Sequence, residues 1–395
     1  MKHRVVILGA GYAGLPAARR LANQVRSDEV EVTVVSSRPT FLERPRLHQL
    51  SAGQRLRTMP LARYLEPAGA RLVIDTVTGI DLDARVVTLD GQGPVRYDTL
   101  VYALGSTTDV DRVPGVAEHA HAFVGASSAE RLREQAGQVN RAGGTFVVCG
   151  GGLTGIETAA EIAQSYPRLS MHLVAPRPPG HWLSSRAQAH VGSAFERLGV
   201  EVHTGRRVSR VDDGALVFDD GTSMPFDGCA WTGGFTVWPL ARDAGLAVDS
   251  AGRILVDERL RSTSHRNVYA IGDAAAASGE WGDSLAMGCR SGGFTGPYVA
   301  DGIATALSGR TPKPFGFRYF HECISLGRGD GVIQFLNADE SPKRAILTGR
   351  LAARYKEVVL SSAAWLFHLP GPYVPRPRRR VAVSPTAARV GVSSG

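Results

Sequence analysis

Short apolar runs recur along this chain, each followed by a glycine-rich turn and then by a segment with helical character. Residues 4–8 (RVVIL) predict a buried strand, LPAARRLAN after the glycines predicts a helix, and residues 30–35 (VEVTVV) predict a second strand. A strand, turn, helix and strand within ~30 residues form a βαβ unit. The same order returns from Thr145, with the strand TFVVC, the helix GIETAAEIAQSY and the strand MHLVA. The pattern therefore predicts an α/β fold that contains this unit twice.

Both turns have the three-glycine spacing of a dinucleotide-binding fingerprint. In such a turn the first glycine allows the tight bend, the second lets the backbone approach a pyrophosphate, and the third lets helix and strand pack closely. The pyrophosphate then meets the unpaired N–H groups and the positive dipole end of the helix. The two copies, VVILGAGYAG and FVVCGGGLTG, consist of Gly9, Gly11 and Gly14, and of Gly150, Gly152 and Gly155. Two copies predict that the chain binds two nucleotides.

A third segment, NVYAIGDAA around Gly272 and Asp273, is typical of flavin-binding sequences. Two other segments, YDTLVYALGS and FDGCAWTGGF, each consist of a strand followed by a glycine turn and are interpreted as crossovers between domains. Because the late motif returns the chain to flavin-type sequence, we expect one nucleotide domain to be inserted within the other.

Composition excludes several classes of function. The net charge is +8, and half of it comes from the arginines at 376 and 378–380, so the rest of the chain is only mildly basic and nucleic-acid binding is not expected. The four cysteines form no CxxC pair, which argues against disulfide-reductase chemistry. The eleven histidines are scattered, so no metal site is predicted. No run approaches the ~20 apolar residues of a membrane span, and with a first strand from Arg4 we expect a cytoplasmic protein.

With these motifs the sequence resembles the two-dinucleotide-domain flavoproteins. Within them it is most similar to the type II NADH dehydrogenases and the apoptosis-inducing-factor-like oxidoreductases, with GGGLTGIE as the most specific match. The resemblance covers about residues 4–305 and implies FAD and either NADPH or NADH as cofactors. Similar proteins pass a hydride from NAD(P)H to the flavin and electrons on to a quinone or another acceptor.

The resemblance also implies a three-part fold of two Rossmann-like domains and a small α+β C-terminal domain. The expected boundaries are 1–115 and 265–308 for the FAD domain, 116–264 for the inserted NAD(P)H domain, 309–370 for the C-terminal domain and 371–395 for a disordered tail. In the C-terminal part TPKPFGFRYF and ISLGRGDGVIQF predict strands, and residues 351–369 predict an amphipathic helix.

A group of residues is assigned to FAD binding. Asp273 matches the residue that holds the ribityl chain in similar proteins, although an Asp there also suits a helix N-cap. Ser36 stands where an acidic residue usually binds the adenosine ribose, and Arg38 is placed to stack on adenine or to neutralise phosphate. Arg44 lies in the segment that runs beside the isoalloxazine ring. The complete set is Gly9, Gly11, Tyr12, Ala13, Gly14, Ser36, Ser37, Arg38, Arg44, Ala103, Gly105, Gly272 and Asp273.

A second group is assigned to NAD(P)H binding. Ala175 occupies the position where a carboxylate would select the 2′-hydroxyl of NADH, and Arg177 follows two residues later. A missing carboxylate beside an arginine accommodates a 2′-phosphate, which predicts NADPH over NADH, unless Arg177 is simply a solvated loop residue. The complete set is Gly150, Gly152, Leu153, Thr154, Gly155, Glu157, Arg177 and Gly233.

Three residues are candidates for catalysis. Glu157 would orient the carboxamide or relay a proton, and its alternative role is to complement the helix dipole. His48 would protonate a reduced acceptor because its charge changes near neutral pH, although a lone histidine is more often structural. Arg290 stands where similar dehydrogenases have a glutamine that lines the quinone slot, and it would suit an acceptor with a carboxylate or phenolate group.

The predicted function is an FAD-dependent NAD(P)H oxidoreductase with a quinone-like acceptor. A biosynthetic flavoenzyme acting on a specialised metabolite and a flavin-based NAD(P)H-sensing binding protein remain alternatives. The amphipathic helix and the arginine-rich tail are compatible with peripheral membrane contact, with domain packing or with a homodimer interface.

Overall fold

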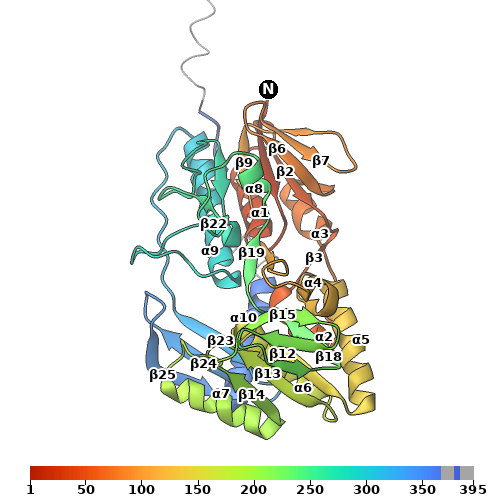
Figure 1. The fold of residues 1–395 in the computed structure, drawn as a ribbon. Helices are drawn as coiled ribbons and strands as arrows, with labels where there is room; N and C mark the ends of the chain where they lie inside the picture. The colour runs from red at the N-terminus through yellow and green to blue at the C-terminus, as the bar shows by residue number, and fades with distance from the viewer. Residues whose placement is uncertain (366–377, 383–395) are drawn as a thin grey trace, which may run out of the picture.

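The computed structural model describes residues 1–365 and 378–382 of the chain (Figure 1). The first sheet has five parallel strands in the order β21–β9–β1–β2–β5. Its central strands are apolar and buried on both faces, as expected for a parallel sheet covered by other layers. Helices α1 (Gly14–Gln24) and α9 (Cys289–Leu307) pack against each other beside it. The strands are β1 (His3–Leu8), β2 (Val30–Ser36), β5 (Arg71–Ile74), β9 (Thr99–Tyr102) and β21 (Val268–Ala270).

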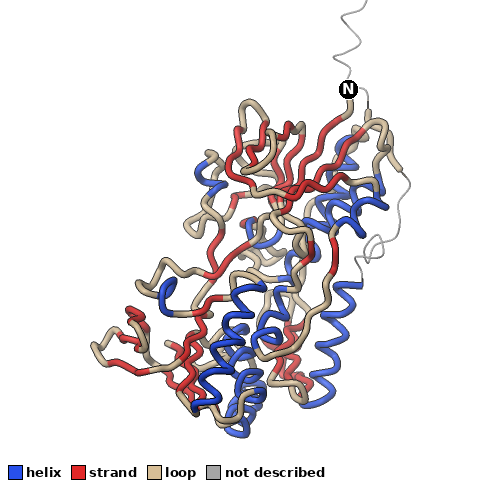
Figure 2. Tube along the Cα trace, turned by 90° about the vertical axis from the view of Figure 1, so that its right-hand side faces the viewer, coloured by secondary structure: helices blue, strands red, loops and turns tan. Residues whose placement is uncertain are grey.

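The second sheet is also parallel and has the order β11–β18–β12–β13–β14. Helices α5 (Ala126–Ala142), α6 (Leu153–Ser165) and α7 (Ser185–Leu198) share one apolar core with it. The two sheets lie in separate lobes of the molecule (Figures 1 and 2). The strands are β11 (His121–Ala122), β12 (Thr145–Cys149), β13 (Ser170–Ala175), β14 (Val200–Thr204) and β18 (Gly228–Trp231).

The chain order confirms that the second nucleotide-binding lobe is inserted into the first. β9 and β21 are neighbours in the first sheet, yet the whole second sheet lies between them in the sequence. The two connections run side by side as the antiparallel strands β10 (Ser106–Thr108) and β19 (Phe235–Val237). Parallel strands need long crossover connections, and here one of these connections is an entire lobe.

Antiparallel hairpins cover the remaining faces. The chain after position 207 forms β15–β16–β17, which shares an apolar core with the second sheet on the face opposite α6. These and the smaller elements are β3 (Thr40–Phe41), β4 (Met59–Pro60), α3 (Ala62–Leu65), η2 (Glu66–Ala68), β6 (Val77–Asp81), β7 (Val86–Leu89), β8 (Val95–Arg96), α4 (Val116–His119), β15 (Val208–Asp212), β16 (Ala215–Phe218), β17 (Ser223–Pro225), α8 (Leu240–Asp243), β20 (Ile254–Leu255), η3 (Gly272–Ala274) and β22 (Ala275–Ala276).

One short segment of the first lobe reaches into the second. After β3 the chain forms η1 (Arg44–Arg46) and α2 (Leu47–Ser51), and α2 packs against α5 and α6. Leu47 is 2% exposed and belongs to the apolar core of the second lobe. The segment predicted to run beside the flavin is therefore held by both lobes.

The C-terminal part is a three-stranded antiparallel sheet, β23 (His321–Ser325), β24 (Gly331–Leu336) and β25 (Pro342–Thr348), covered by α10 (Gly349–Trp365). The strand predicted at 311–320 is wrong. Phe317 and Tyr319 are buried in alternation with exposed neighbours, as in a strand, but this segment pairs with no ladder partner. Its backbone bonds, such as that from the amide of Leu336 to the carbonyl of Phe320 at 2.9 Å, do not continue into a ladder, so local alternation alone gave a false strand.

The predicted helix over 351–369 is confirmed as α10 up to Trp365, and positions 366–369 lie outside the described residues. Its buried face consists of Ala352, Lys356 and Leu360, whereas Leu351 and Val358 are 64% and 66% exposed. Two apolar residues of the predicted amphipathic helix, Leu351 and Val358, therefore point to solvent, and a lysine occupies the buried face.

Part of the predicted disordered tail is ordered. Residues 378–382 lie against the first lobe, where the amide of Arg379 donates to the carbonyl of Gln24 at 2.7 Å and the amide of Ala382 donates to that of Leu307 at 2.8 Å. The prediction was wrong here because it rested on composition, and composition gives no information on backbone hydrogen bonds to the ends of α1 and α9. Among the described helices, none combines the length and the hydropathy that a bilayer span requires.

Candidate active site

The first glycine fingerprint adopts the geometry that its spacing predicts. Gly9 follows β1 with φ +98°, and a Cβ there would collide with the carbonyl of Ala103 on the neighbouring strand. A Cβ on Gly14 would collide with the carbonyl of Gly9, so α1 and β1 are in close contact. A Cβ on Gly11, in contrast, would meet no atom within 4 Å. The turn therefore has an open side at its second glycine, where a pyrophosphate fits.

The second fingerprint repeats this geometry in the other lobe. Gly150 has φ +121° and touches Thr232, and a Cβ on Gly155 would collide with the carbonyl of Gly150. Gly152 is open, with nothing within 4 Å of an added Cβ. The N-terminus of α6 has no side-chain cap, and neither has that of α1, so the first N–H groups of both helices are available to a ligand. The residues present thus fit one dinucleotide in each lobe.

The remaining residues of the predicted FAD group gather near the first fingerprint. Gly272 has φ +65°, and its added Cβ would lie 3.1 Å from the Cβ of Ala13, which places η3 at the start of α1. The ring of Tyr12 packs edge-on against Phe41 at 5.0 Å between centroids. Asp273 accepts hydrogen bonds from the hydroxyl of Ser106 (2.6 Å) and the amide of Gly288 (2.7 Å). Its carboxylate is thereby oriented by the first connection between the lobes.

Three polar residues after β2 and in η1 lie in the same region. Arg44 donates a hydrogen bond to the carbonyl of Ser106. Burial lowers the pKa of Arg44, and the negative charge of the nearby Asp273 opposes this effect. Ser36, at the end of β2, bonds within its own turn to the carbonyl of Arg38 at 2.9 Å. The guanidinium of Arg38 packs against the open side of Gly125, at the beginning of α5. Ser37 is exposed beside them, and Gly105 has φ +67° with open space around it.

The predicted coenzyme residues lie at the carboxyl end of the second sheet. β13 ends at the buried Ala175, and Arg177 follows on the surface. An added Cβ on Gly151 would lie 2.9 Å from the Cβ of Ala175, so this loop packs directly on the second fingerprint. Gly233 lies against the indole of Trp231, and Leu153 and Thr154 begin α6. These positions share the open edge where ligands bind in parallel α/β sheets.

The structure brings Glu157 and His48 together and adds Lys356, which the sequence did not single out. Glu157 lies in the first turns of α6, His48 in α2 and Lys356 in α10, and all three are less than 10% exposed. The ammonium group of Lys356 contacts Oε1 of Glu157, which also accepts the amide of Ser325 at 3.0 Å. Nδ1 of His48 lies 3.4 Å from Oε2 of Glu157. Three segments far apart in the sequence thus form one buried ionisable cluster.

Burial sets the protonation of this cluster. It lowers the pKa of Lys356 to about 7, with the positive charge of Arg46 adding to the effect and Glu357 opposing it. Burial, followed by the charges of Lys356, Arg46 and Arg328, lowers the pKa of His48 well below its usual value. Burial and the three nearby cations thus oppose the predicted charge change of His48 near neutral pH, and the carboxylate of Glu157 is the neighbour that favours the charged form. Lys356 is the group placed to exchange a proton near neutrality.

The helix that provides Lys356 is anchored by Arg46. Its guanidinium donates to both carboxylate oxygens of Glu357 at 3.0 and 2.7 Å, to Glu43 at 3.1 Å and to Gln49 at 3.1 Å. Arg46 and Lys356 could have been recognised from sequence only as charges within apolar segments. Their roles depend on α10 packing over η1 and α2, which no local pattern encodes.

Arg290 does not face an open site. Its guanidinium lies 2.7 Å from Glu340 and 3.3 Å from Glu322, and it stacks over the ring of Tyr319 at 4.9 Å. Two carboxylates already compensate its charge, which argues against the predicted role of Arg290 in binding an anionic acceptor. It joins α9 to the C-terminal sheet.

Two adjoining cavities open next to the buried cluster. One, of about 310 Å³, is lined by Lys356, Gln49, Ser325, Arg328 and Arg354 among others. The other, of about 250 Å³, shares the lining residues Gln49, Arg328 and Glu357 with the first. A small molecule in the first cavity would contact Lys356 and would meet three arginines, Arg328, Arg350 and Arg354, and one carboxylate, Glu357.

Comparison with known proteins agrees with this geometry. Residues 3–292 match the family of pyridine nucleotide-disulphide oxidoreductases. An NADH dehydrogenase-like protein of Mycobacterium tuberculosis is 32% identical over 351 residues, covering 83% of this chain and 87% of the relative. The demethylphylloquinone reductase of Synechocystis is 26% identical over 371 residues, covering 89% and 92%.

A solved structure shares the fold. NDH2 from Plasmodium falciparum, determined in complex with NADH, superposes with a TM-score of 0.80 at 15% identity and covers 94% of this chain and 97% of that one. Cys149 and Cys229 are buried on the neighbouring strands β12 and β18 of the second sheet. The two open glycine turns, the inserted lobe and the family match together show that the chain belongs to the pyridine nucleotide-disulphide oxidoreductase family and is an FAD-dependent NAD(P)H oxidoreductase.

Proposed function

We propose that this protein passes electrons from NADPH to a quinone-like acceptor that enters the cavity beside Lys356. FAD bound at the first fingerprint supplies the redox chemistry by taking up a hydride and releasing electrons to the acceptor. The observation that carries the proposal is that Lys356 contacts Glu157 and also lines the first cavity. A quinone takes up protons as it is reduced, and Lys356 is placed to supply one. Relatives named as demethylphylloquinone reductase and type II NADH:quinone oxidoreductase support this class of acceptor.

The chain's own residues have separate roles in this proposal. Lys356, with a pKa of about 7, gives a proton to the acceptor oxygen. Glu157 holds the ammonium group and is itself oriented by the amide of Ser325. His48 stays neutral and fixes the second oxygen of Glu157. Arg46 positions α10 through Glu357, so that Lys356 stays at the cavity.

The test is anaerobic reduction by NADPH followed by reoxidation with quinones, oxygen and aromatic acids. We expect naphthoquinones and benzoquinones to reoxidise the flavin fastest. Lys356→Met should slow this step by a factor on the order of 100, the range of general acid catalysis, and leave reduction by NADPH unchanged. Lys343→Met, at an exposed lysine of β25, is the matched control. Reoxidation by quinones no faster than by oxygen would refute the proposal.

A second candidate is a biosynthetic oxidoreductase that acts on an acidic metabolite. The observation in its favour is the basic lining of the larger cavity, to which Arg328, Arg350 and Arg354 all contribute. Faster reoxidation by an aromatic acid than by any quinone in the same panel would select this candidate.

We also propose NADPH as the preferred coenzyme. β13 ends without a carboxylate at Ala175, and the exposed Arg177 is placed to meet a 2′-phosphate. Arg177→Glu should lower kcat/KM for NADPH at least about tenfold, equivalent to about 1.4 kcal/mol, and change that for NADH little. Arg141→Glu is the control, because this exposed arginine ends α5 at the opposite edge of the sheet. A wild-type preference for NADH would contradict the assignment.

Peripheral membrane contact is proposed through the exposed side of α10. Leu351 and Val358 are 64% and 66% exposed, and Arg350 and Arg354 are exposed beside them. Apolar side chains next to arginines suit the surface of an anionic bilayer. The intact chain should float with anionic vesicles, and Leu351→Asp/Val358→Asp should not. Absence of flotation refutes the contact, and a dimer on a sizing column that the double variant abolishes would assign this surface to a second copy.

A further inference from the structure

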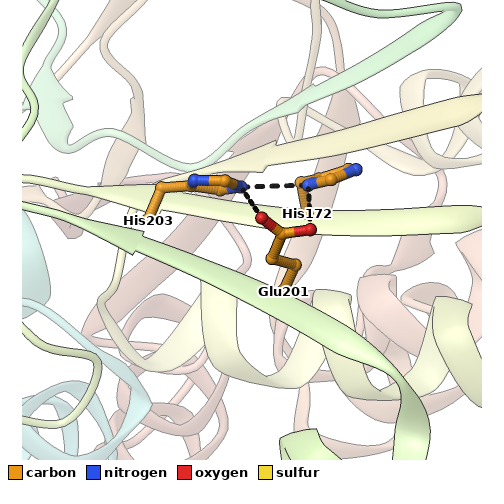
Figure 3. A group of neighbouring side chains, drawn as sticks. All are labelled: His172, Glu201 and His203. Carbon is orange, nitrogen blue, oxygen red and sulfur yellow. Dashed lines mark hydrogen bonds and ion pairs between the residues drawn. The ribbon is translucent and has the colours of Figure 1, made fainter.

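Two histidines and a glutamate converge on the second sheet, away from the redox site. His172 lies on β13, and Glu201 and His203 lie on the neighbouring edge strand β14. The parallel register pairs His172 with Glu201 and Val174 with His203, so the three polar side chains are on one face. Figure 3 shows them pointing toward one another. The sequence predicted no metal site because His172 lies 29 positions before Glu201 and 31 before His203. The pairing of β13 with β14 brings the three residues together.

The donor atoms have the spacing of a coordination sphere. Nδ1 of His172 lies 3.0 Å from Nε2 of His203 and 3.6 Å from Oε2 of Glu201. Nε2 of His203 lies 3.4 Å from Oε1 of Glu201. A tetrahedral zinc ion with bonds of ~2.0–2.1 Å separates its ligand atoms by roughly 3.3 Å, and the three distances bracket that value.

The chemistry of these groups also favours a cation. Two imidazole nitrogens that face each other share a single proton at best, whereas a metal ion accepts both lone pairs together with the carboxylate. Nε2 of His172 lies 3.0 Å from the hydroxyl of Ser170, which orients the ring and leaves Nδ1 for a metal.

We propose that His172, Glu201 and His203 bind one zinc ion, with its fourth position left to solvent. Two histidines, one carboxylate and an open position form an established type of zinc coordination. His172 and His203 are 13% and 24% exposed, which fixes two ligands, and Glu201 is 65% exposed, which leaves a path for the ion.

The ion would cross-link the edge strand β14 to β13, because its ligands come from both strands. Among the described strands, only β13 pairs with β14, and β13 leads directly to Ala175 and the coenzyme loop. Met171 and Leu173 point to the opposite face, into the core shared with α6. The zinc site is therefore separated by the sheet from the helix that carries Glu157, and its role is stabilisation of the NAD(P)H lobe rather than redox chemistry.

The test uses the FAD-loaded protein after chelator treatment. Zinc competition against a chromophoric chelator should give one equivalent for the wild type. His203→Ala and Glu201→Gln should each bind zinc at least about tenfold more weakly, by analogy with other losses at metal sites. His265→Ala is the control, since this histidine is bonded only locally to Ser264. Cobalt should give tetrahedral d–d bands beyond the flavin absorption in the wild type but not in His203→Ala.

Zinc should also raise the Tm of the wild type and leave that of the two variants unchanged. Glu201→Gln keeps the shape of an exposed side chain, so it folds even if a histidine replacement disturbs the strand. Equal zinc affinity of the wild type and of both variants, or the lack of any zinc binding by the wild type, would overturn the proposal.

Discussion

Replacing Lys356 by methionine tests how burial controls the ionisable cluster. The pKa of this lysine is about 7 in the folded protein and ~10.4 in an unfolded chain. Between these values the unfolded chain binds one more proton than the folded one, so the stability of the wild type rises with pH. Below pH 7 the lysine is protonated in both the folded and the unfolded state, so it causes no further change in the free energy of unfolding with pH.

The expected magnitude follows from the linkage relation. Each pH unit within this window adds about 1.4 kcal/mol to the wild type relative to Lys356→Met, and two units add about 3 kcal/mol. Denaturant unfolding of the wild type and the variant at pH 7.5, 8.5 and 9.5, with saturating FAD, measures this difference. The same comparison in a Glu157→Gln background isolates the lysine from its partner.

Parallel stability curves would refute the reasoning. They would mean that the attraction of Glu157 outweighs burial and keeps Lys356 charged throughout, as a tightly hydrogen-bonded buried pair can. Lys343→Met should run parallel to the wild type, because an exposed lysine has nearly the same environment in both states.

The remaining predictions concern the fingerprint, the anchor of α10 and the neutral histidine. Gly11→Ala should fold but bind FAD at least about tenfold more weakly, which the ratio of flavin to protein absorbance measures. Gly14→Ala should instead lower the stability, measured by thermal unfolding, because its Cβ collides with the carbonyl of Gly9. Arg46→Met should reduce stability by about 3 kcal/mol in urea unfolding, since it leaves Glu43 buried without its partner, and an unchanged midpoint would contradict that role. His48→Asn should have the same inflections in the pH profile of kcat as the wild type, because burial lowers the pKa of His48 well below its usual value and keeps the ring neutral. Disappearance of an inflection near pH 6–7 would show that His48 titrates there.

Local signals in the sequence were enough for the two nucleotide-binding units. The strand, the glycine turn and the helix of each unit are adjacent in the chain, so the contacts that require Gly14 and Gly155 arise within a short segment, whereas Gly9 and Gly150 also meet the remote residues Ala103 and Thr232. The repeat of the unit and the late NVYAIGDAA segment then predicted the inserted lobe, which the strand order confirmed. Propensity and spacing suffice here because the interactions they encode are themselves local.

The C-terminal part shows where local patterns fail. Alternating burial at Phe317 and Tyr319 resembles a strand, but a strand requires a continuous ladder of hydrogen bonds. Within the described residues this segment makes only separate backbone bonds, such as that from the amide of Tyr319 to the carbonyl of Ala338. In α10 the apolar residues Leu351 and Val358 are exposed, and Lys356 is buried instead. A buried charge of this kind is recognisable only when its partner is known.

The sequence by itself determined the two dinucleotide-binding turns, their order and the loss of the carboxylate at the end of β13. Only the tertiary structure decided that Lys356 meets Glu157, that Arg290 is compensated by two glutamates, and that His172 and His203 face each other. The physical reason is that burial, charge compensation and metal-ligand spacing depend on distances between segments remote in the chain, and these distances are set by packing rather than by neighbouring residues.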